Sequence, residues 1–422
     1  MAELGEGAAV PVIKPKYINA AIVEVRFESG IELYELESSG AAKALPPAGT
    51  PHWAETGRAY PAVYVREGGA GEVKTLKVKV RWDQQGCDGG AKLEGASADG
   101  ELKITGDFTV SGAKGEAEAS CQFTKRPGVV RNHGRGLSLA WQVTAGGETG
   151  AARGGTPLTL FFVDQKPRPI AWLGTGYKSF YLPIADWATQ WAEGKKDTAP
   201  VLAALWDKFS DGTGARVPHV TGFSYWRTDD PVQNLIELLQ PGSAAGRKGW
   251  SCTSIAHLFM ECLALHGIQC GEVVPLTPPG ALMFLVKNWR HDPRPVPNWP
   301  AKPEDYYGGT WAHSGRPPLN ERVPTSHGWV VDFRKEPGVP AQGQRDAPLG
   351  FQNHWIVEVS GKLYDTSYGM VHPSDIARYA AAALAGWLVG VLPDAPPARR
   401  AKAWVCHVLL KHRLMRIDRA RN

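Results

Sequence analysis

Cysteines and long apolar runs are scarce in this sequence. Six cysteines among 422 residues are too few for a fold built on disulfides. Cys87 and Cys121 both fall in the β-rich first part and could pair, which the sequence leaves open. The longest apolar stretch, 379–392, contains glycine and tryptophan and is shorter than a membrane-spanning helix needs. We therefore expect neither a disulfide-rich scaffold nor a membrane span.

Targeting segments, blocks of like charge and nucleotide motifs are also missing. Residues 1–6 have neither a basic start nor an apolar run, so no secretory signal is expected. This predicts a cytoplasmic product, with export by a signal-independent route left open. The net charge of +5 is small, and the basic residues of 411–421 are interpreted as solvated surface, not as a nucleic-acid contact. No phosphate-binding glycine loop or dinucleotide fingerprint is present, so no cofactor is predicted.

The composition is that of a globular protein with two different parts. Hydrophobic residues make up 43% and charged residues 21%, and the length suggests two domains. In the first part, 1–165, apolar and charged residues alternate, as in Leu76, Val78, Val80 and Trp82. Glycine-rich turns separate the strands, and a turn is also expected at 105–107. The pattern predicts an antiparallel β-sandwich, acting as a docking or delivery domain.

The second part, 166–422, changes to helical spacing and then back to strands. Helices are predicted around 187–192, 201–209 and 231–239, and again at 380–389 and 403–410. The stretch 275–350 is rich in proline and tryptophan and longer than an ordinary connection. We interpret it as an insertion that is either a functional lid or loosely ordered.

One cysteine opens a predicted helix in the second part. Apolar residues follow Cys252 at helical spacing, Ser251 is a plausible N-cap, and Gly267 suits the residue after the helix end. The first turn of a helix favours a thiolate, because the helix dipole and free N–H groups stabilise negative charge there. Cys252 is therefore a candidate nucleophile, and the alternative is a small buried apolar side chain.

A histidine and an aspartate follow in a predicted β-hairpin. His354 opens one strand, Asp365 ends the next, and the residues at 360–361 suit a tight turn. A carboxylate beside an imidazole keeps the correct tautomer and stabilises the charged form. His327 also opens a strand, but Asp332 would lie on that same strand and point elsewhere. The pattern therefore favours His354.

These segments resemble the transglutaminase-like superfamily. The matching features are a cysteine opening a helix that ends in Leu-His-Gly-Ile, and a His-Trp strand followed by Tyr-Asp-Thr-Ser-Tyr-Gly. The resemblance covers about 167–369. It implies an α+β fold with a papain-like core, in which helices pack on an antiparallel sheet. It also implies that Cys252 is the nucleophile, His354 the base and Asp365 the residue that orients the base. The short spacing from His354 to Asp365 and the long insertion depart from the family pattern.

An oxyanion hole would need the backbone N–H of Cys252 and one further donor. The indoles of Trp250 and Trp226 are candidates, although core packing is the usual role of tryptophan. Five residues of the cysteine helix and its continuation are possible metal or acid–base groups: His257, Glu261, Cys262, His266 and Cys270. They lack a second ligand pair at suitable spacing, so no metal is predicted.

The predicted reaction is cysteine-dependent acyl transfer on protein glutamine or other amide groups, by crosslinking or deamidation. The alternatives are a cysteine protease or amidase acting on peptide or peptidoglycan bonds, and a non-enzymatic binding module. A β-sandwich ahead of such a domain resembles bacterial secreted effectors and toxins directed against bacteria or hosts. That architecture implies a protein or peptide substrate and a cognate inhibitor or immunity protein.

Overall fold

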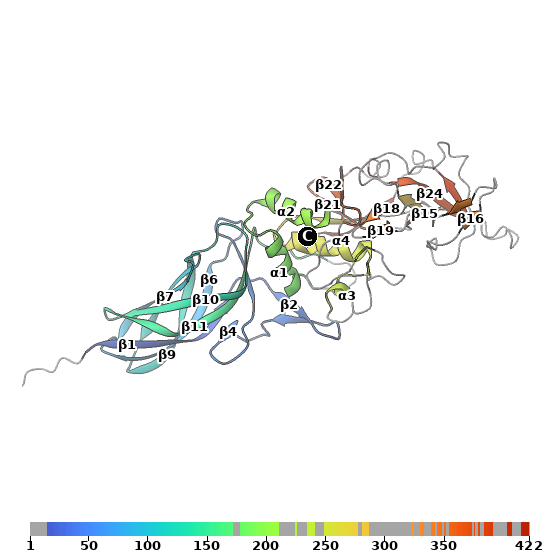
Figure 1. Cartoon of the computed structure of the whole chain (residues 1–422). Coiled ribbons are helices and arrows are strands. Elements are labelled where there is room, and N and C mark those ends of the chain that lie inside the picture. Colours follow the sequence, from blue (N-terminus) through green and yellow to red (C-terminus); the bar gives the residue numbers. More distant parts are fainter. Residues whose placement is uncertain are drawn as a thin grey trace, which may run out of the picture.

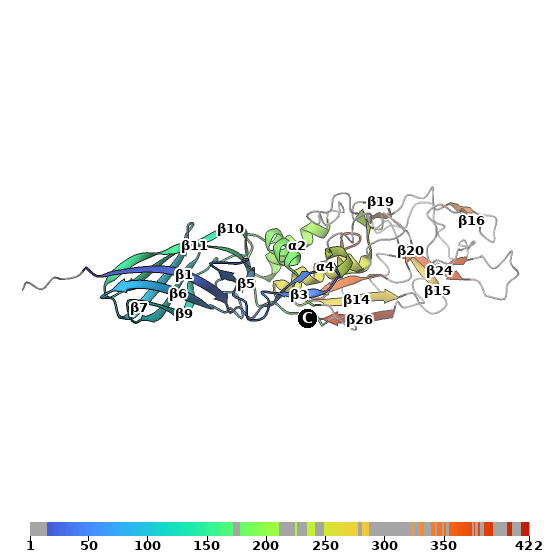
Figure 2. The same ribbon diagram turned by 90° about the horizontal axis from the view of Figure 1, so that it is seen from below.

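The computed structural model describes residues 15–171, 178–210, 224–225, 234–240, 249–276, 281–286, 322–324, 330–332, 339–341, 344–347, 350–351, 354–373, 375, 379, 384–390, 403–406 and 415–421. A group of long strands from the first part of the chain forms one end of the molecule (Figure 1). Helices lie next to them, and the strands from later in the chain lie beyond the helices (Figure 2).

Seven strands of the first part form a closed barrel. Their order is β1-β6-β9-β8-β7-β10-β11, and β11 pairs with β1 again in parallel, with Ala20 opposite Ala152. The bounds are β1 Tyr17–Phe27, β6 Thr75–Gln85, β7 Gly89–Ser97, β8 Lys103–Val110, β9 Lys114–Lys125, β10 Arg131–Ala145 and β11 Glu148–Val163. Two shorter strands extend the sheet, β4 (Trp53–Ala54) beside β1 and β5 (Ala62–Val65) beside β11.

The predicted β-sandwich is therefore wrong. The alternation of apolar and polar residues does mark strands with one buried face, since Val78 and Val80 of β6 are fully buried. However, a barrel and a sandwich both need one buried face per strand, so alternation alone does not separate them. The deciding feature is the pairing of β1 with β11, two strands that are far apart in the sequence. Register shifts within β1 and β10 add the local twist and bend that favour closure.

The turn expected at 105–107 is also wrong, because β8 runs through it without a break. Gly106 lies inside this strand, directly opposite Cys121 of β9. A Cβ atom on Gly106 would lie 2.3 Å from the sulfur of Cys121. The glycine therefore marks a place where two strands approach closely. Close approach is, besides a bulge, a common reason for glycine inside a strand.

The second part contains four helices among its described residues, α1 Leu182–Trp191, α2 Thr198–Ser210, α3 Leu235–Leu239 and α4 Cys252–Leu265. A five-stranded antiparallel sheet has the order β23-β22-β21-β14-β26. Its bounds are β14 Gly271–Leu276, β21 Ile356–Val359, β22 Lys362–Asp365, β23 Met370–Pro373 and β26 Met415–Arg421. A second sheet, β20-β15-β24-β25, consists of β15 Ala281–Val286, β20 Gly350–Phe351, β24 Leu384–Gly390 and β25 Ala403–Cys406.

Four pairs of short strands complete the described elements. They are β2 Leu33–Leu36 with β3 Ala42–Leu45, β12 Ser224–Tyr225 with β13 Gly249–Trp250, β16 Arg322–Pro324 with β17 Val330–Asp332, and β18 Val339–Ala341 with β19 Gln344–Ala347. Most of the predicted insertion at 275–350 lies outside the described residues.

The predicted α+β fold class, a sandwich followed by a papain-like core of helices on one antiparallel sheet, is contradicted. The described residues are mostly β, with a closed barrel and strands in several sheets. The expected helices at 380–389 and 403–410 coincide, where they are described, with strands β24 and β25. A short apolar run suits a buried strand as well as a buried helix. Here the pairing of β24 with β15 and β25 decides in favour of the strand.

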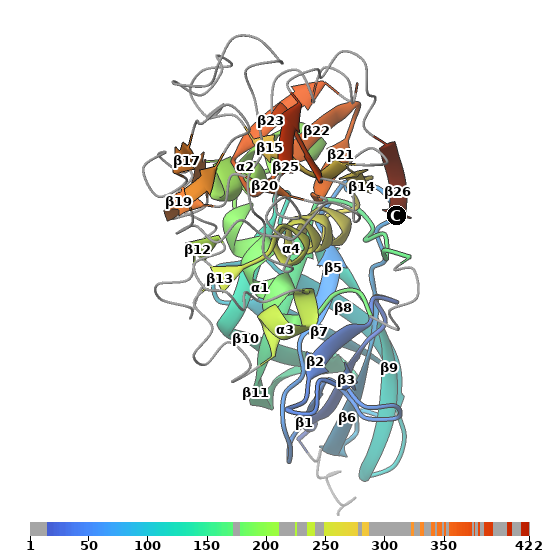
Figure 3. The same cartoon turned by 90° about the vertical axis from the view of Figure 1, so that its right-hand side faces the viewer.

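Helix α4 is the centre of the second part. Apart from one residue it is buried along its whole length. It contacts α1, α2 and α3 as well as β14 and β21 (Figure 3). The hydrophobic cluster around it includes Val63 and Val65 of β5 and Phe161 and Val163 of β11. The barrel therefore contributes directly to the core that holds α4, and the division into domains 1–165 and 166–422 stays a prediction.

Within the described part of the chain, no helix is both long and apolar enough to cross a membrane.

Candidate active site

Cys252 is the first residue of α4, and its position is fixed by the cap expected from the sequence. The side chain of Ser251 accepts a hydrogen bond from the N–H of Ser254 at 3.3 Å. The side chain of Ser254 accepts one from the N–H of Ser251 at 3.1 Å. This reciprocal capping box satisfies two donors at the helix start and defines where the helix begins. Cys252 therefore lies where the helix dipole favours a thiolate.

The end of α4 is also as predicted. His266 is the C-cap, and Gly267 follows with φ of 73°. A Cβ at Gly267 would lie 2.6 Å from the carbonyl oxygen of Lys166. Both the left-handed backbone and this close approach require glycine.

His354 and Asp365 are brought together by the predicted hairpin. Strands β21 and β22 pair with Val357 opposite Tyr364. Ser360 and Gly361 both have positive φ, 49° and 73°, as a tight two-residue hairpin turn requires. The hairpin places Asp365 at the end of β22 beside His354, just before β21. Nε2 of His354 donates to Oδ2 of Asp365 at 2.8 Å.

The third member of the arrangement is the sulfur of Cys252, which lies close enough to the imidazole of His354 to raise its pKa. The three residues are 4%, 1% and 0% exposed in the order Cys252, His354 and Asp365. Burial alone disfavours the imidazolium, but the charges and hydrogen bonds of Asp365 and Cys252 together raise the pKa of His354 to about 10. The histidine is therefore held in its charged form at neutral pH, between the sulfur of Cys252 and the carboxyl group of Asp365.

The carboxylate of Asp365 is held by further donors. Its Oδ1 accepts hydrogen bonds from the N–H groups of Ser367 at 3.0 Å and Tyr368 at 3.3 Å. Its Oδ2 also accepts one from the hydroxyl of Tyr379 at 3.2 Å. The ring of Tyr368 packs against the imidazole of His354, with centroids 5.7 Å apart. Both oxygens of the carboxylate are thus held by donors, and Oδ2 is the one that faces the histidine.

Sequence reasoning missed the two tyrosines. Tyr368 lies in the Tyr-Asp-Thr-Ser-Tyr-Gly segment already singled out, so its closeness to the site could have been inferred. Tyr379 lies at the start of an apolar stretch and gives no signal of its own. Only the fold places its hydroxyl on Asp365.

Of the two predicted oxyanion donors, only the backbone of Trp250 lies among the described residues. Trp250 ends β13, which pairs in parallel with β12, and it directly precedes the cap residue Ser251. The side chain of Trp250, the whole of Trp226 and the alternative histidine His327 lie outside the described residues. Asp332 ends β17.

The other titratable residues of the cysteine helix bond to neighbouring elements. Nε2 of His257 lies 2.8 Å from Oε1 of Glu272 on β14. Glu261 accepts a hydrogen bond from the N–H of Phe180 at 3.0 Å. Each of these two side chains, considered together from the sequence, thus bonds to an element outside the cysteine helix. These contacts fasten the helix to its surroundings.

His266 connects the helix end to the barrel. Its Nδ1 accepts a hydrogen bond from the N–H of Asp164, just after β11, at 3.3 Å. Its Nε2 donates to the carbonyl oxygen of Ala188 in α1 at 3.2 Å. Burial lowers the pKa of His266 to about 4, which keeps the ring neutral.

Four other cysteines have side chains among the described residues, and each of them is buried. Cys87, Cys121, Cys262 and Cys270 are not joined by disulfides, so Cys87 and Cys121 do not form the pair that the sequence left open. Burial raises the thiol pKa of Cys121, Cys262 and Cys270, which makes them poor nucleophiles. Among the residues the structure describes, no group of three metal-binding side chains comes together.

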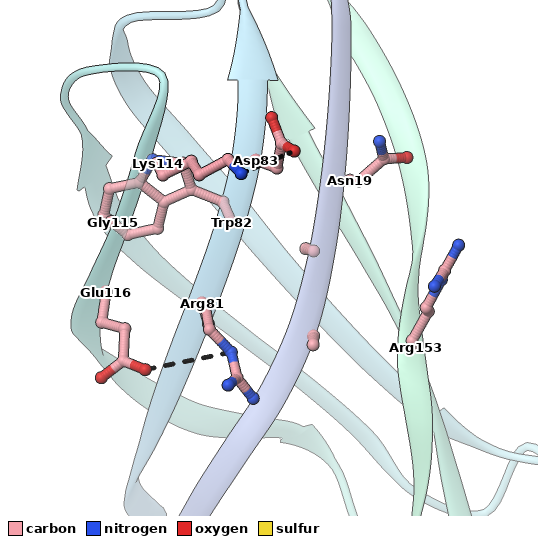
Figure 4. Close-up of a pocket in the computed structure, with 10 residues that line it drawn as sticks. Asn19, Arg81, Trp82, Asp83, Lys114, Gly115, Glu116 and Arg153 are labelled. Carbon is pink, nitrogen blue, oxygen red and sulfur yellow. Dashed lines mark ion pairs between the residues drawn. The ribbon is translucent and has the colours of Figure 1, made fainter.

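A depression of about 620 Å³ lies on the barrel, between β1, β6, β9 and β11. Charged side chains of both signs line it, and Arg81 pairs there with Glu116 (Figure 4). It contains none of the residues around Cys252. Its charges are largely paired with each other, so it offers no chemistry of its own.

No protein-family model matches this chain, and no curated protein matches its sequence.

Proposed function

We propose that this protein is a cysteine enzyme that transfers acyl groups from amides, acting on the glutamine side chains of proteins or peptides. The observation that carries the proposal is the buried row of sulfur, imidazole and carboxylate formed by Cys252, His354 and Asp365. Nucleophile, base and orienting group in contact are what covalent catalysis by cysteine requires.

The chemistry follows from this arrangement. The thiolate of Cys252 attacks the amide carbonyl, and the carbonyl π electrons move to oxygen. When the C–N bond breaks, the imidazolium of His354 gives its proton to the departing ammonia or amine, and a thioester remains on the sulfur. A lysine or polyamine that attacks the thioester gives an isopeptide or amide, and water gives the free acid. With Nε2 bonded to Asp365, Nδ1 is the nitrogen that exchanges protons near the sulfur.

The surroundings support each role. The N-terminus of α4 stabilises the thiolate, and the N–H of Cys252 has no partner within the helix at this position. This N–H is a candidate donor to the oxyanion. Burial of the three side chains strengthens the ion pair, because it lowers the local dielectric. A non-enzymatic module would have no need for so costly an arrangement of buried charge.

Glutamine is proposed as the substrate group because of the resemblance of the two segments to transglutaminase-like proteins. A protease or amidase would use the same three residues and differ in its products. The expectation of a bacterial effector depended on a β-sandwich, which the barrel replaces, so it stays a prediction from the sequence alone.

The test combines product analysis with thiol reactivity. The full chain is incubated with a glutamine-rich protein and a fluorescent amine, and mass spectrometry separates amine incorporation, deamidation and new N-termini. We expect amine incorporation or deamidation by wild type, loss in Cys252→Ala, and retention in Cys270→Ala, a buried cysteine whose sulfur bonds to the carbonyl oxygen of Met260. In parallel, iodoacetamide should alkylate Cys252 near neutral pH faster than it alkylates a model thiol. The proposal fails if no product forms and Cys252 shows no enhanced reactivity.

A further inference from the structure

Tyr379 and His354 both donate hydrogen bonds to the carboxylate of Asp365. Its hydroxyl donates to Oδ2 of Asp365 at 3.2 Å, and the same oxygen accepts the bond from Nε2 of His354 at 2.8 Å. The tyrosine is 1% exposed. Two donors therefore compete for one carboxylate oxygen in a dry environment, where each hydrogen bond is stronger than in water.

The phenol is held in place by a different part of the chain from the one that carries His354. The ring of Tyr379 packs edge-on against His372 of β23, with centroids 5.3 Å apart and planes at 87°. Its backbone N–H donates to the carbonyl oxygen of Asp375 at 2.9 Å. The position of the hydroxyl therefore does not depend on the position of His354, and the hydroxyl can orient Asp365 independently.

The hydroxyl acts only as a donor toward the carboxylate. Burial, followed by the charge of Asp365, raises the pKa of Tyr379 well above its ordinary value, so the O–H stays protonated. The positive end of this O–H dipole faces Asp365 on the side shared with His354. It therefore draws electron density from the oxygen that stabilises the imidazolium.

We propose that Tyr379 is a positioning residue for the cysteine chemistry, which orients Asp365 and limits how tightly that carboxylate holds the proton of His354. The inference rests on the proposed function, in which the imidazolium must release its proton to the leaving amine. A carboxylate with no second donor would hold the imidazolium more firmly and slow that release. Tyr379 acts through Asp365 and has no contact with the substrate in this role.

The first test removes the hydroxyl and keeps the ring. In protein labelled with ¹³Cε1-histidine, the signal of His354 is assigned by its loss in His354→Gln and then titrated by NMR. We expect His354 to titrate at higher pH in Tyr379→Phe than in wild type. Tyr364→Phe is the matched control, because Tyr364 adjoins Asp365 in sequence but its ring packs on Trp206 and Phe259. An unchanged titration in Tyr379→Phe would overturn the proposal.

A second variant changes the donor in the opposite direction. Fluorotyrosine at position 379 keeps the ring and makes the hydroxyl a stronger donor, so His354 should titrate at lower pH than in wild type. This substitution also covers the case in which Tyr379→Phe does not fold. A shift upward, or no shift, would contradict the role proposed for the phenol.

The third measurement follows turnover of the acyl-enzyme formed with p-nitrophenyl acetate. Hydrolysis of the thioester needs neutral His354 as base. Loss of a hydrogen bond to the charged carboxylate changes the protonation equilibrium of His354 about tenfold. At pH 8 we therefore expect hydrolysis to be about tenfold slower in Tyr379→Phe and unchanged in Tyr364→Phe. Equal rates in Tyr379→Phe and wild type would count against the inference. If wild type forms no acyl-enzyme, the proposed function fails, while the NMR titration still decides the role of Tyr379.

Discussion

The charge of Asp365 should decide whether Cys252 is a thiolate at neutral pH. Replacing Asp365 by Asn keeps the size of the side chain and removes its negative charge. The pKa of His354 lies at about 10 instead of its ordinary 6.5, which corresponds to about 5 kcal/mol in favour of the imidazolium. Burial acts in the opposite direction and only the contact with Cys252 would remain to raise the pKa, so without the carboxylate the pKa of His354 should fall well below about 10.

The thiol then loses the cation that stabilises its anion. An unperturbed cysteine has a pKa of about 8.5, so only about 1% of it is thiolate at pH 6.5. We therefore expect the rate constant for alkylation of Cys252 by iodoacetamide at pH 6.5 to fall about 100-fold in Asp365→Asn.

The assay is the pH dependence of alkylation from pH 5 to 10, with mass spectrometry restricting the measurement to the Cys252 peptide. Access of the reagent to a buried sulfur changes the absolute rate but not the pH at which the thiolate forms, so the midpoint is the quantity to compare. Glu358→Gln is the control, since it removes a carboxylate from the same hairpin on β21. The same midpoint in Asp365→Asn and wild type would refute the ion-pair reasoning.

Two further predictions concern the ends of α4. The pKa of His266 is lowered to about 4 in the folded state. The unfolded chain therefore binds a proton below pH 6.5 that the folded state excludes. The stability that this group contributes is present above pH 6.5 and is lost as the pH falls toward 4. Urea unfolding should show that wild type loses about 3 kcal/mol more than His266→Gln between pH 7 and pH 4, and equal losses would contradict the assignment. At the other end, Ser251→Ala removes the N-cap and should lower the free energy of unfolding by about 1 kcal/mol, whereas no change would mean that the cap is not limiting.

The local features of the candidate site could be read from the sequence because they follow short-range rules. Ser251 caps a helix since its hydroxyl reaches an N–H three residues later, whatever lies around it. Gly267 ends the helix since other residues avoid the left-handed backbone. The turn at Ser360 and Gly361 follows from the same kind of constraint. These rules were enough to propose Cys252, His354 and Asp365 as one group.

Other parts of the site depended on residues that lie together only in the folded chain. Nothing near Tyr379 in the sequence indicates that its hydroxyl reaches Asp365. The bond from Asp164 to His266 likewise joins the end of the barrel to the end of the cysteine helix. No local pattern describes such contacts, because each is set by how whole elements pack.

The sequence by itself determined which segments alternate, where α4 begins and ends, and which hairpin presents the histidine and the aspartate. Only the tertiary structure decided that the first part closes as a barrel, that Leu384–Gly390 is a strand, and that the barrel shares a core with α4. The physical reason is the same in each case. Hydrogen bonds and backbone sterics over a few residues act in the chain alone, whereas strand pairing and burial need a partner from elsewhere in the chain.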